Sequence, residues 1–207
     1  GVHISFEVFP PKTDAGFESV LKATDGIAEL NPSFISVTYG AGGGTSKNTV
    51  NIASHIKNDL KIPALAHLTC VSSTKEEVHK VIGQLQEAGI ENILALRGDI
   101  PQDGQFPLPG QYSHASELIE DIKKTGDFCI GAACYPEGHV EMEHKKDDIR
   151  YLKEKVDCGV DFITTQMFFD NDIFYNFLYR IREQGIMVPV LPGIMPITTK
   201  KQLARSC

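Results

Sequence analysis

The chain has 207 residues, of which 42% are apolar and 23% charged, so it can bury the core of one globular domain over residues 1–207. Acidic residues outnumber basic residues by 27 to 20, and the net charge of −7 argues against nucleic-acid and anionic-membrane partners. No apolar run is long enough to span a bilayer or to act as a secretion signal. The five cysteines form no CxxC pair, which predicts free thiols in the reducing cytoplasm.

Short β-branched or apolar runs alternate along the chain with longer segments of helical periodicity. Strands are predicted over residues 3–8, 33–38, 63–68, 92–97, 128–134, 161–166 and 187–191. Apolar stripes predict the intervening helices, and one of these helices starts at Thr74, which is predicted to form a capping box with Glu77. Four glycines follow predicted helices where left-handed caps are common: Gly89, Gly126, Gly159 and Gly185.

This βα alternation predicts a parallel sheet with helices outside it. Six predicted strands end on a polar residue at intervals of 29 to 38 residues: Glu7, Thr38, His67, Arg97, Tyr135 and Gln166. In an open sheet, functional residues concentrate at one switch point, whereas in a barrel all carboxyl ends of the strands face one mouth. The near-equal register favours a (β/α)8 TIM-type barrel. Only seven units fit in the sequence, so we expect the eighth βα unit to be missing from this chain.

Two segments near the amino terminus suggest a site at this mouth. Glu7 shares one face of its strand with Ser5, and an inward carboxyl that is partly desolvated suits a general acid. A salt bridge to Arg97 or to a lysine explains Glu7 equally well. The glycine-rich segment 37–46 matches neither a Walker A loop nor GxGxxG. It either lets the backbone approach a flat ligand or phosphate, or forms a turn before a helix.

Later strand ends carry further polar residues, each with two interpretations. Arg97 and Asp99 flank Gly98 and suit recognition of a heterocycle or a mutual salt bridge. Tyr135 could stack on a ring and His139 could bind a phosphate, or both could be ordinary surface or packing residues.

The segments that follow continue this pattern. Asp148 and Lys155 lie on one face of a predicted helix, toward a bound polar tail or toward water. Gln166 offers a donor and an acceptor to a pterin edge. The histidines show no metal-ligand spacing, so no metal site is expected.

Seven segments, in this order, resemble the methylenetetrahydrofolate reductase family: FEVFPP, VTYGAGG, AHLTC, LRGDIP, YPEGH, DFITTQMFFD and LPGIMP. The resemblance covers essentially the whole chain. It implies a (β/α)8 barrel that binds FAD and reduces 5,10-methylenetetrahydrofolate to 5-methyltetrahydrofolate. The reductant is NAD(P)H, the mechanism is ping-pong, and the reaction belongs to one-carbon and methionine metabolism.

The resemblance also implies roles for individual residues. Glu7 matches the proton donor that opens the methylene bridge, and Asp99 matches a catalytic carboxylate that contacts the folate pterin near the flavin ring. Gln166 and Gln202 match further folate-binding residues. The positions that match FAD-binding residues are Thr38, Tyr39, Ala41, His67, Arg97, Gly98, Asp99, Ala115, Tyr135, His139, Asp148 and Lys155.

The implied cofactor is FAD, and the implied partners are methylenetetrahydrofolate and NAD(P)H. A partner flavoprotein as electron donor and a homo-oligomer also suit the sequence. One alternative is a truncated barrel that binds flavin or folate weakly and has no activity. Another is an unrelated carbon–carbon lyase acting on a phosphorylated substrate, which would need a Schiff-base lysine or metal ligands at the strand ends. The predicted strand ends carry neither.

Overall fold

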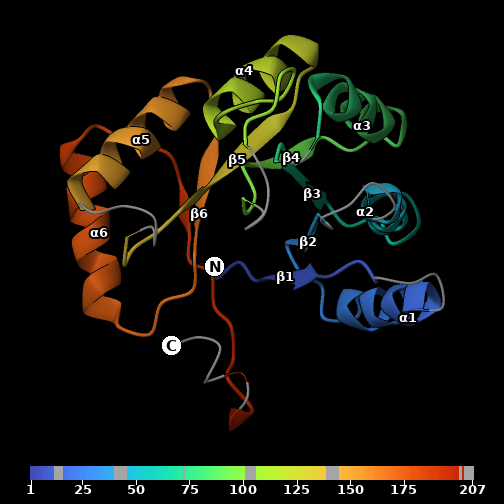
Figure 1. The fold of residues 1–207 in the computed structure, drawn as a ribbon. Helices are drawn as coiled ribbons and strands as arrows, with labels where there is room; N and C mark the ends of the chain where they lie inside the picture. Colours follow the sequence, from blue (N-terminus) through green and yellow to red (C-terminus); the bar gives the residue numbers. More distant parts are fainter. Residues whose placement is uncertain are drawn as a thin grey trace.

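Seven parallel strands form one curled sheet in the computed structural model of the chain (Figure 1). The structure describes residues 1–11, 16–39, 46–71, 73–100, 106–138, 145–200 and 202, with no side-chain description for 145–147. The strands are β1 (Ser5–Val8), β2 (Phe34–Val37), β3 (Ala64–Thr69), β4 (Asn92–Leu96), β5 (Cys129–Cys134), β6 (Phe162–Thr165) and β7 (Val190–Leu191). Each pairs in parallel with the next in chain order, as the βα alternation predicts.

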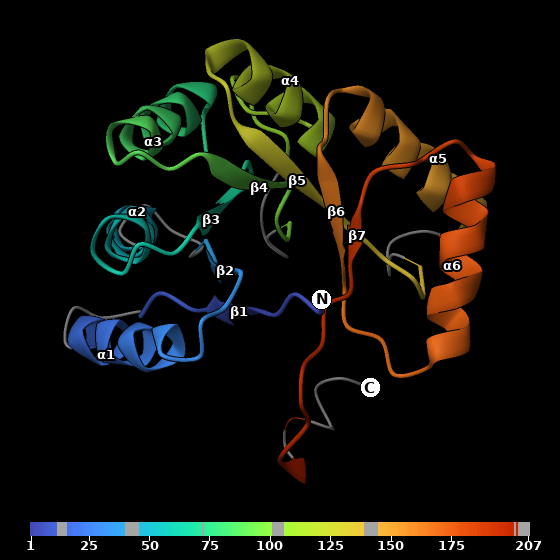
Figure 2. The same ribbon diagram turned by 180° about the vertical axis from the view of Figure 1, so that it is seen from behind.

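The helices lie on the outer side of the curled sheet, as Figure 1 and the reverse view in Figure 2 show. They are α1 (Phe17–Ala28), α2 (Ser46–Ser54) continued by the π-helix η2 (His55–Asp59), α3 (Lys75–Glu87), α4 (Ala115–Thr125), α5 (Lys145–Asp157) and α6 (Asn171–Glu183). None of the described helices combines the length and the apolar character that a membrane span requires.

Strand parity divides the two faces of the sheet. In β2, Ile35 and Val37 are fully buried in the core that the sheet shares with the helices, whereas Ser36 between them faces the inside of the curl. In β1, Val8 is buried on the helix side and Glu7 is on the inner side, beside Ser36. The inward direction predicted for the polar positions is therefore confirmed at these strands.

Helix ends follow the predicted signals with one exception. Thr74 and Glu77 form the capping box, with Thr74 N donating to Glu77 Oε2 at 2.7 Å. The glycines Gly89, Gly159 and Gly185 have φ values of 74°, 111° and 74° and provide left-handed caps.

The prediction for Gly126 is wrong, because this residue has φ −171° and is extended. Its amide still donates to Ile122 O at 3.2 Å, so the last turn of α4 closes without a left-handed residue. A Cβ atom at position 126 would lie 2.4 Å from Gln86 Nε2 and 3.0 Å from the Phe128 ring, so the end of the Gln86 side chain would have to shift.

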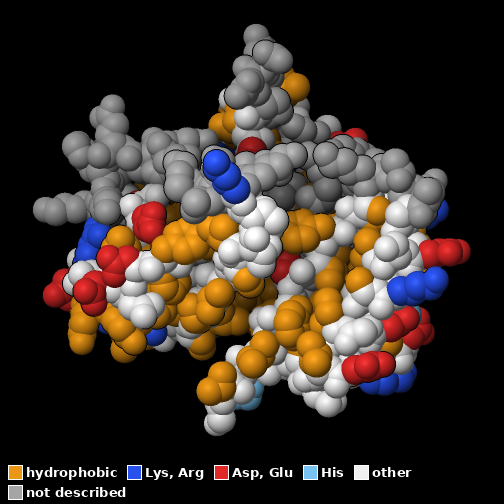
Figure 3. All heavy atoms as spheres, turned by 90° about the horizontal axis from the view of Figure 1, so that it is seen from below, with side chains coloured by type: hydrophobic (Ala, Val, Ile, Leu, Met, Phe, Trp, Pro, Cys, Tyr) orange, Lys and Arg blue, Asp and Glu red, His pale blue; other side chains and the backbone are white. Residues whose placement is uncertain are grey.

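The sheet curls into an incomplete barrel. Within the described residues, β1 and β7 are each paired along one edge only. The last strand comprises Val190–Leu191 and is shorter than predicted, because Pro189 has no amide hydrogen and Pro192 ends the pairing. Figure 3 shows apolar side chains gathered across the middle of the face seen from below, with charged side chains toward its two sides.

Candidate functional site

A cavity of about 610 Å³ opens at the carboxyl ends of the central strands. Residues at the ends of β2, β3, β4 and β5 line it, together with the start of α4 and one face of α5. Ten of the sequence-predicted site residues lie in its wall: Thr38, Tyr39, His67, Arg97, Gly98, Asp99, Ala115, Tyr135, Asp148 and Lys155. Residues distant in sequence thus meet where the barrel prediction places them.

Helix α5 presents one polar face to this cavity. Asp148, Tyr151 and Lys155 line the cavity, while Ile149 and Leu152 are buried in the core with exposed fractions of 7% and 4%. Lys155 Nζ donates to Ala133 O at 2.8 Å, which anchors the ammonium group at the end of β5. Burial lowers the pKa of Lys155, and the nearby Cys134 and Asp148 partly offset this effect. The cavity-facing interpretation of this helix is the one that the structure supports.

The turn after β4 places three site residues on a fixed backbone. Val71 N donates to Arg97 O at 2.8 Å, and Arg97 Nε donates to Gly98 O at 3.2 Å. Gly98 has φ +87°, and a Cβ atom there would lie 2.5 Å from Val71 Cγ1. Only glycine fits this position without strain, so the turn holds Arg97 and Asp99 on either side of it in the cavity wall.

Two tyrosines supply aromatic wall to the cavity. Tyr39 follows β2 and Tyr135 follows β5, and both are half-buried. Burial raises the pKa of each phenol, so both hydroxyls stay neutral at physiological pH. Neutral tyrosines suit stacking and hydrogen bonding rather than nucleophilic chemistry.

Glu7 lies beside the cavity, where its carboxylate is next to His67, a residue of the cavity wall. Ser36 Oγ donates to Glu7 Oε2 at 3.4 Å, and His67 Nε2 lies 3.4 Å from the same oxygen. Burial raises the pKa of Glu7, and the hydrogen bond from Ser36 partly counteracts this. A carboxyl group with a raised pKa keeps its proton to higher pH, which suits a proton donor. The sequence left a salt bridge to Arg97 or a lysine open; the contacts described for this carboxylate are those with Ser36 and His67.

His67 lies deeper than the sequence predicted. The expected position was a strand end, but β3 continues to Thr69, so His67 lies inside the strand. Its side chain is buried, with 7% of the residue exposed, and burial lowers its pKa to about 4. The ring is therefore neutral at physiological pH.

Some predicted site residues lie elsewhere. Gln166 follows β6 and is exposed, and the structure does not place it in the cavity wall. Gln202 Oε1 accepts hydrogen bonds from the Thr198 and Thr199 amides at 2.9 and 3.0 Å, so this amide caps a turn. Ala41 and His139 fall outside the described residues. The folate roles of both glutamines stay predictions.

Several wall residues were not predicted. Thr69 lies two residues after His67 on the same strand face, and Tyr151 lies three residues after Asp148 on the same helix face. Both could have been found by extending these periodicities. Val71 and Ser116 also line the cavity, but nothing in their local sequence separates them from ordinary loop and helix residues.

A parallel strand–helix sheet that curls around a cavity at the carboxyl ends of its strands is the architecture of the (β/α)8 barrel enzymes. The family model for methylenetetrahydrofolate reductase matches residues 1–207. The chain therefore belongs to the methylenetetrahydrofolate reductase family, as its sequence motifs predicted.

Curated relatives from bacteria and plants match nearly all of this chain. It is 37% identical to 5,10-methylenetetrahydrofolate reductase of Escherichia coli, over 97% of this chain and 67% of the relative. The Pectobacterium carotovorum enzyme of the same name is 38% identical, over 99% of this chain and 67% of the relative. Methylenetetrahydrofolate reductase (NADH) 1 of Arabidopsis thaliana is 40% identical over 97% of this chain. The chain spans only 36% of the length of that plant protein.

Two solved structures show the same fold at low sequence identity to this chain. An uncharacterized Clostridium thermocellum protein that binds two copies of 5-methyl-5,6,7,8-tetrahydrofolic acid aligns with a TM-score of 0.69, at 17% identity over 98% of this chain and 69% of that chain. Dihydropteroate synthase from Xanthomonas albilineans, in complex with 7,8-dihydropteroate, aligns with a TM-score of 0.62 at 17% identity, over 98% of this chain and 75% of that chain. At such identity, these neighbours establish the fold alone.

Proposed function

We propose that this chain binds FAD in the described cavity and reduces 5,10-methylenetetrahydrofolate to 5-methyltetrahydrofolate with NAD(P)H by a ping-pong mechanism. The observation that carries the proposal is the convergence of the predicted FAD-binding residues, from β2 to α5, on one cavity. Its volume of about 610 Å³ lies within the usual cofactor-site range of roughly 300–1,000 Å³. The names of the bacterial and plant relatives support the folate reaction.

The chemistry of the wall fits a flavin dinucleotide. Arg97 and Lys155 bring positive charge for a diphosphate, and Asp148 offers an acceptor for ribose hydroxyls. Tyr39 and Tyr135 offer aromatic faces to flat rings. These residues would hold FAD, and FAD when bound supplies the redox chemistry between the nicotinamide donor and the folate.

Glu7 is the proton donor in this proposal. It gives its proton to the folate nitrogen whose bond to the bridging carbon breaks, and the electron pair of that bond stays on the nitrogen. The raised pKa of Glu7, caused by burial, keeps this proton bound to a higher pH than in an ordinary glutamate. Asp99, in the cavity wall beside Gly98, would accept a hydrogen bond from the pterin.

The electron donor is proposed to be NADH or NADPH. The name of the Arabidopsis relative specifies NADH, and this favours NADH as the first donor to test. If a partner flavoprotein supplies the electrons instead, neither NADH nor NADPH would bleach the bound flavin.

The test separates the two half-reactions in purified protein. We expect a yellow preparation whose flavin absorbance is bleached anaerobically by NADH or NADPH and restored by methylenetetrahydrofolate. Because proton donation serves only the folate step, Glu7→Gln should keep bleaching within about threefold of the wild-type rate and slow reoxidation by on the order of 10²–10⁴.

Three outcomes contradict the proposal in different ways. A preparation that binds no FAD would remove the cofactor assignment. Equal loss of both half-reactions in Glu7→Gln would remove the assignment of Glu7 as acid. A chain that binds FAD but turns over neither substrate would support a flavin-binding module without activity, the alternative that the sequence left open.

A further inference from the structure

Among the described residues, one buried side-chain polar atom lacks a hydrogen-bond partner. Within the described part of the chain, His67 Nε2 is buried and makes no hydrogen bond. A buried donor or acceptor left unpaired costs about 1–3 kcal/mol, so such an atom calls for an explanation. The polar group that lies beside it is Glu7 Oε2, at 3.4 Å.

The geometry around Glu7 is asymmetric between its two carboxyl oxygens. Ser36 is the register partner of Glu7 in the sheet, and its hydroxyl donates to Oε2 at 3.4 Å. Ser36 also pairs with Leu65 of β3, and His67 lies two residues further along the same face of that strand. The next two strands of the sheet, β2 and β3, therefore each direct a polar group at Oε2 of Glu7.

The two groups differ in burial. The His67 side chain is 8% exposed, whereas the Glu7 side chain is 48% exposed, which leaves space for its carboxyl group to turn. Hydrogen bonds of catalytic groups are often long or misaligned before substrate binds. A small rotation of the Glu7 carboxyl group would bring Oε2 into line with the buried ring nitrogen.

We propose that His67 is a positioning residue for Glu7, a neutral imidazole whose Nε2–H donates to Oε2 and leaves Oε1 to carry the transferable proton. This inference rests on the proposed role of Glu7 as proton donor. When Oε1 gives its proton to the folate nitrogen, the negative charge left on the carboxylate is stabilised by the Nε2–H of His67 and the hydroxyl of Ser36. The proton of His67 does not move, and solvent reprotonates Glu7.

The first test needs no cofactor and no turnover. Protein labelled with ¹⁵N-histidine should show a neutral His67 ring with its proton on Nε2 at pH 7, the signal being assigned by its absence in His67→Gln. The Nε2 shift should change in Glu7→Gln, because its acceptor changes. A proton on Nδ1, or a ring that titrates near the ordinary histidine pKa of about 6.5, would overturn the proposal.

The second test uses the half-reactions of the FAD-loaded protein. His67→Leu removes the donor. Because His67 also lines the proposed FAD cavity, both half-reactions can slow, but in the FAD-loaded fraction reoxidation by folate should slow about 10-fold to 100-fold more than bleaching by NADH, the range for losing a hydrogen bond to a charged group. His67→Gln places an amide donor near Nε2 and should recover most of the rate. Equal slowing of both half-reactions in the FAD-loaded fraction, or no effect of His67→Leu on reoxidation, would contradict the proposal.

The pH profile distinguishes positioning from a structural effect. A donor to Oε2 favours the ionised carboxylate, so His67→Leu should raise the Glu7 pKa and move the alkaline fall of the reoxidation rate to higher pH. In the described part of the chain, His67 of β3 is the titratable side chain beside the Glu7 carboxylate. Helix α1, which packs on β1, carries Glu18, Lys22 and Asp25, and none of these changes in the variant. An unmoved profile would contradict the proposal.

A control separates this inference from the proposed function. His79 lies on α3, outside the cavity wall, and His79→Leu should leave both half-reactions and the profile unchanged. If the wild-type protein takes up no FAD, the proposed function fails while the ¹⁵N measurement still decides the tautomer of His67.

Discussion

Gly98 has a backbone conformation that other residues adopt only with strain. Its φ is +87°, a value that strains any residue with a side chain. A Cβ atom there would also lie only 2.5 Å from Val71 Cγ1, which is a second, independent obstacle. We predict that Gly98→Ala lowers the free energy of unfolding by about 2–4 kcal/mol, from backbone strain and overpacking together. Urea unfolding measures this, and the same variant should bind FAD more weakly because Arg97 and Asp99 move.

A matched variant separates the two obstacles. Gly185 has φ +74° but open space around its Cα, so Gly185→Ala should cost only about 1–2 kcal/mol. Adding Val71→Ala to Gly98→Ala should restore part of the stability if the clash contributes. Equal losses for the two glycine variants would show that the approach to Val71 is unimportant.

The sequence predicted the position of a site residue correctly where a polar side chain directly follows a strand. Arg97, Tyr135 and Thr38 each directly follow a strand, so a sequence pattern placed them correctly in the cavity wall. The depth of His67 could not be predicted, because the extension of β3 to Thr69 depends on its pairing with β4. The exposed position of Gln166 likewise depends on how the chain leaves β6.

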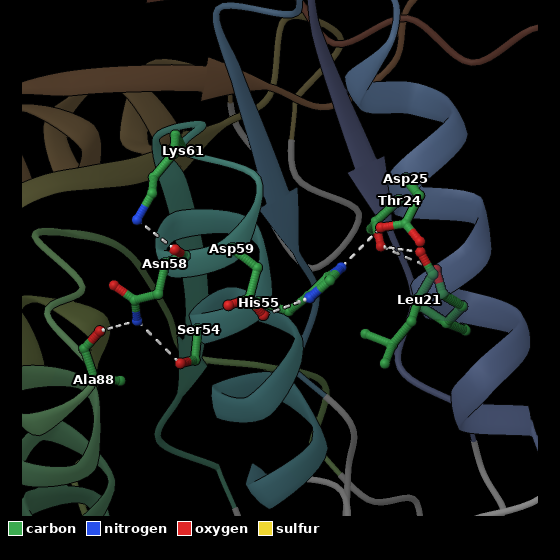
Figure 4. Close-up of polar contacts among 10 residues, drawn as sticks. Leu21, Thr24, Asp25, Ser54, His55, Asn58, Asp59, Lys61 and Ala88 are labelled. Atoms are coloured by element: carbon green, nitrogen blue, oxygen red, sulfur yellow. Dashed lines mark hydrogen bonds and ion pairs between the residues drawn. The ribbon is translucent and has the colours of Figure 1, made fainter.

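Helices α1 and η2 are joined by one histidine (Figure 4). His55 Nε2 lies 2.8 Å from Asp25 Oδ1 of α1, and His55 Nδ1 lies 2.8 Å from Asp59 Oδ2 at the end of η2. Asn58 extends this contact to the next unit, since its Nδ2 donates to Ala88 O at 2.9 Å just after α3. These contacts link three successive βα units on the outside of the sheet.

The histidine link predicts a pH-dependent stability. Burial disfavours the charged ring, but the hydrogen bonds and charges of Asp25 and Asp59 outweigh this effect and raise the pKa of His55. A raised folded-state pKa means that the link stabilises fully below the unfolded value of about 6.5 and loses its contribution as pH rises through the folded value.

The measurement compares wild type with His55→Gln by urea unfolding at pH 5.5 and pH 9. The variant should be less stable by about 1 kcal/mol or less at the lower pH, the range for exposed ion pairs, and nearly equal to wild type at the higher pH. Asp25→Asn should reproduce the trend. A difference that grows with pH would show that the ring is linked in its neutral form.

The π-helix η2 is an element that the sequence pattern did not predict. The periodicity of an ordinary α-helix does not reveal one widened turn, in which Leu60 N donates to His55 O across five residues. The capping box at Thr74, in contrast, is a local interaction, and the sequence predicted it correctly. Elements held by local contacts are thus predictable, whereas this turn depends on partners in α1 and α3.

Each strand of the sheet pairs only with its neighbours in chain order. The cavity wall and Glu7 belong to different strands of this sheet. The cavity wall runs from β2 to α5, whereas Glu7 belongs to β1, whose second edge is unpaired within the described residues. Edge elements open at lower free energy than central ones. Glu7, the proposed proton donor, should therefore lose its native position before the proposed cofactor site does as the protein is destabilised.

A pair of core variants tests this order. Val8→Ala in β1 should move the loss of folate-dependent reoxidation to lower urea and leave flavin release in place, because β1 supplies no cavity wall. Ile93→Ala in the centre of β4 should move both transitions, with a loss of about 2–5 kcal/mol. Coincident transitions in all three proteins would show that the sheet unfolds as one cooperative unit.

The separate location of Glu7 and the cavity changes how a preparation should be judged. Colour and flavin content would report on the central strands and their helices, whereas reductase activity would also require an intact first strand. A brightly yellow sample can then be catalytically silent, and stoichiometric flavin is no measure of the fraction of competent molecules.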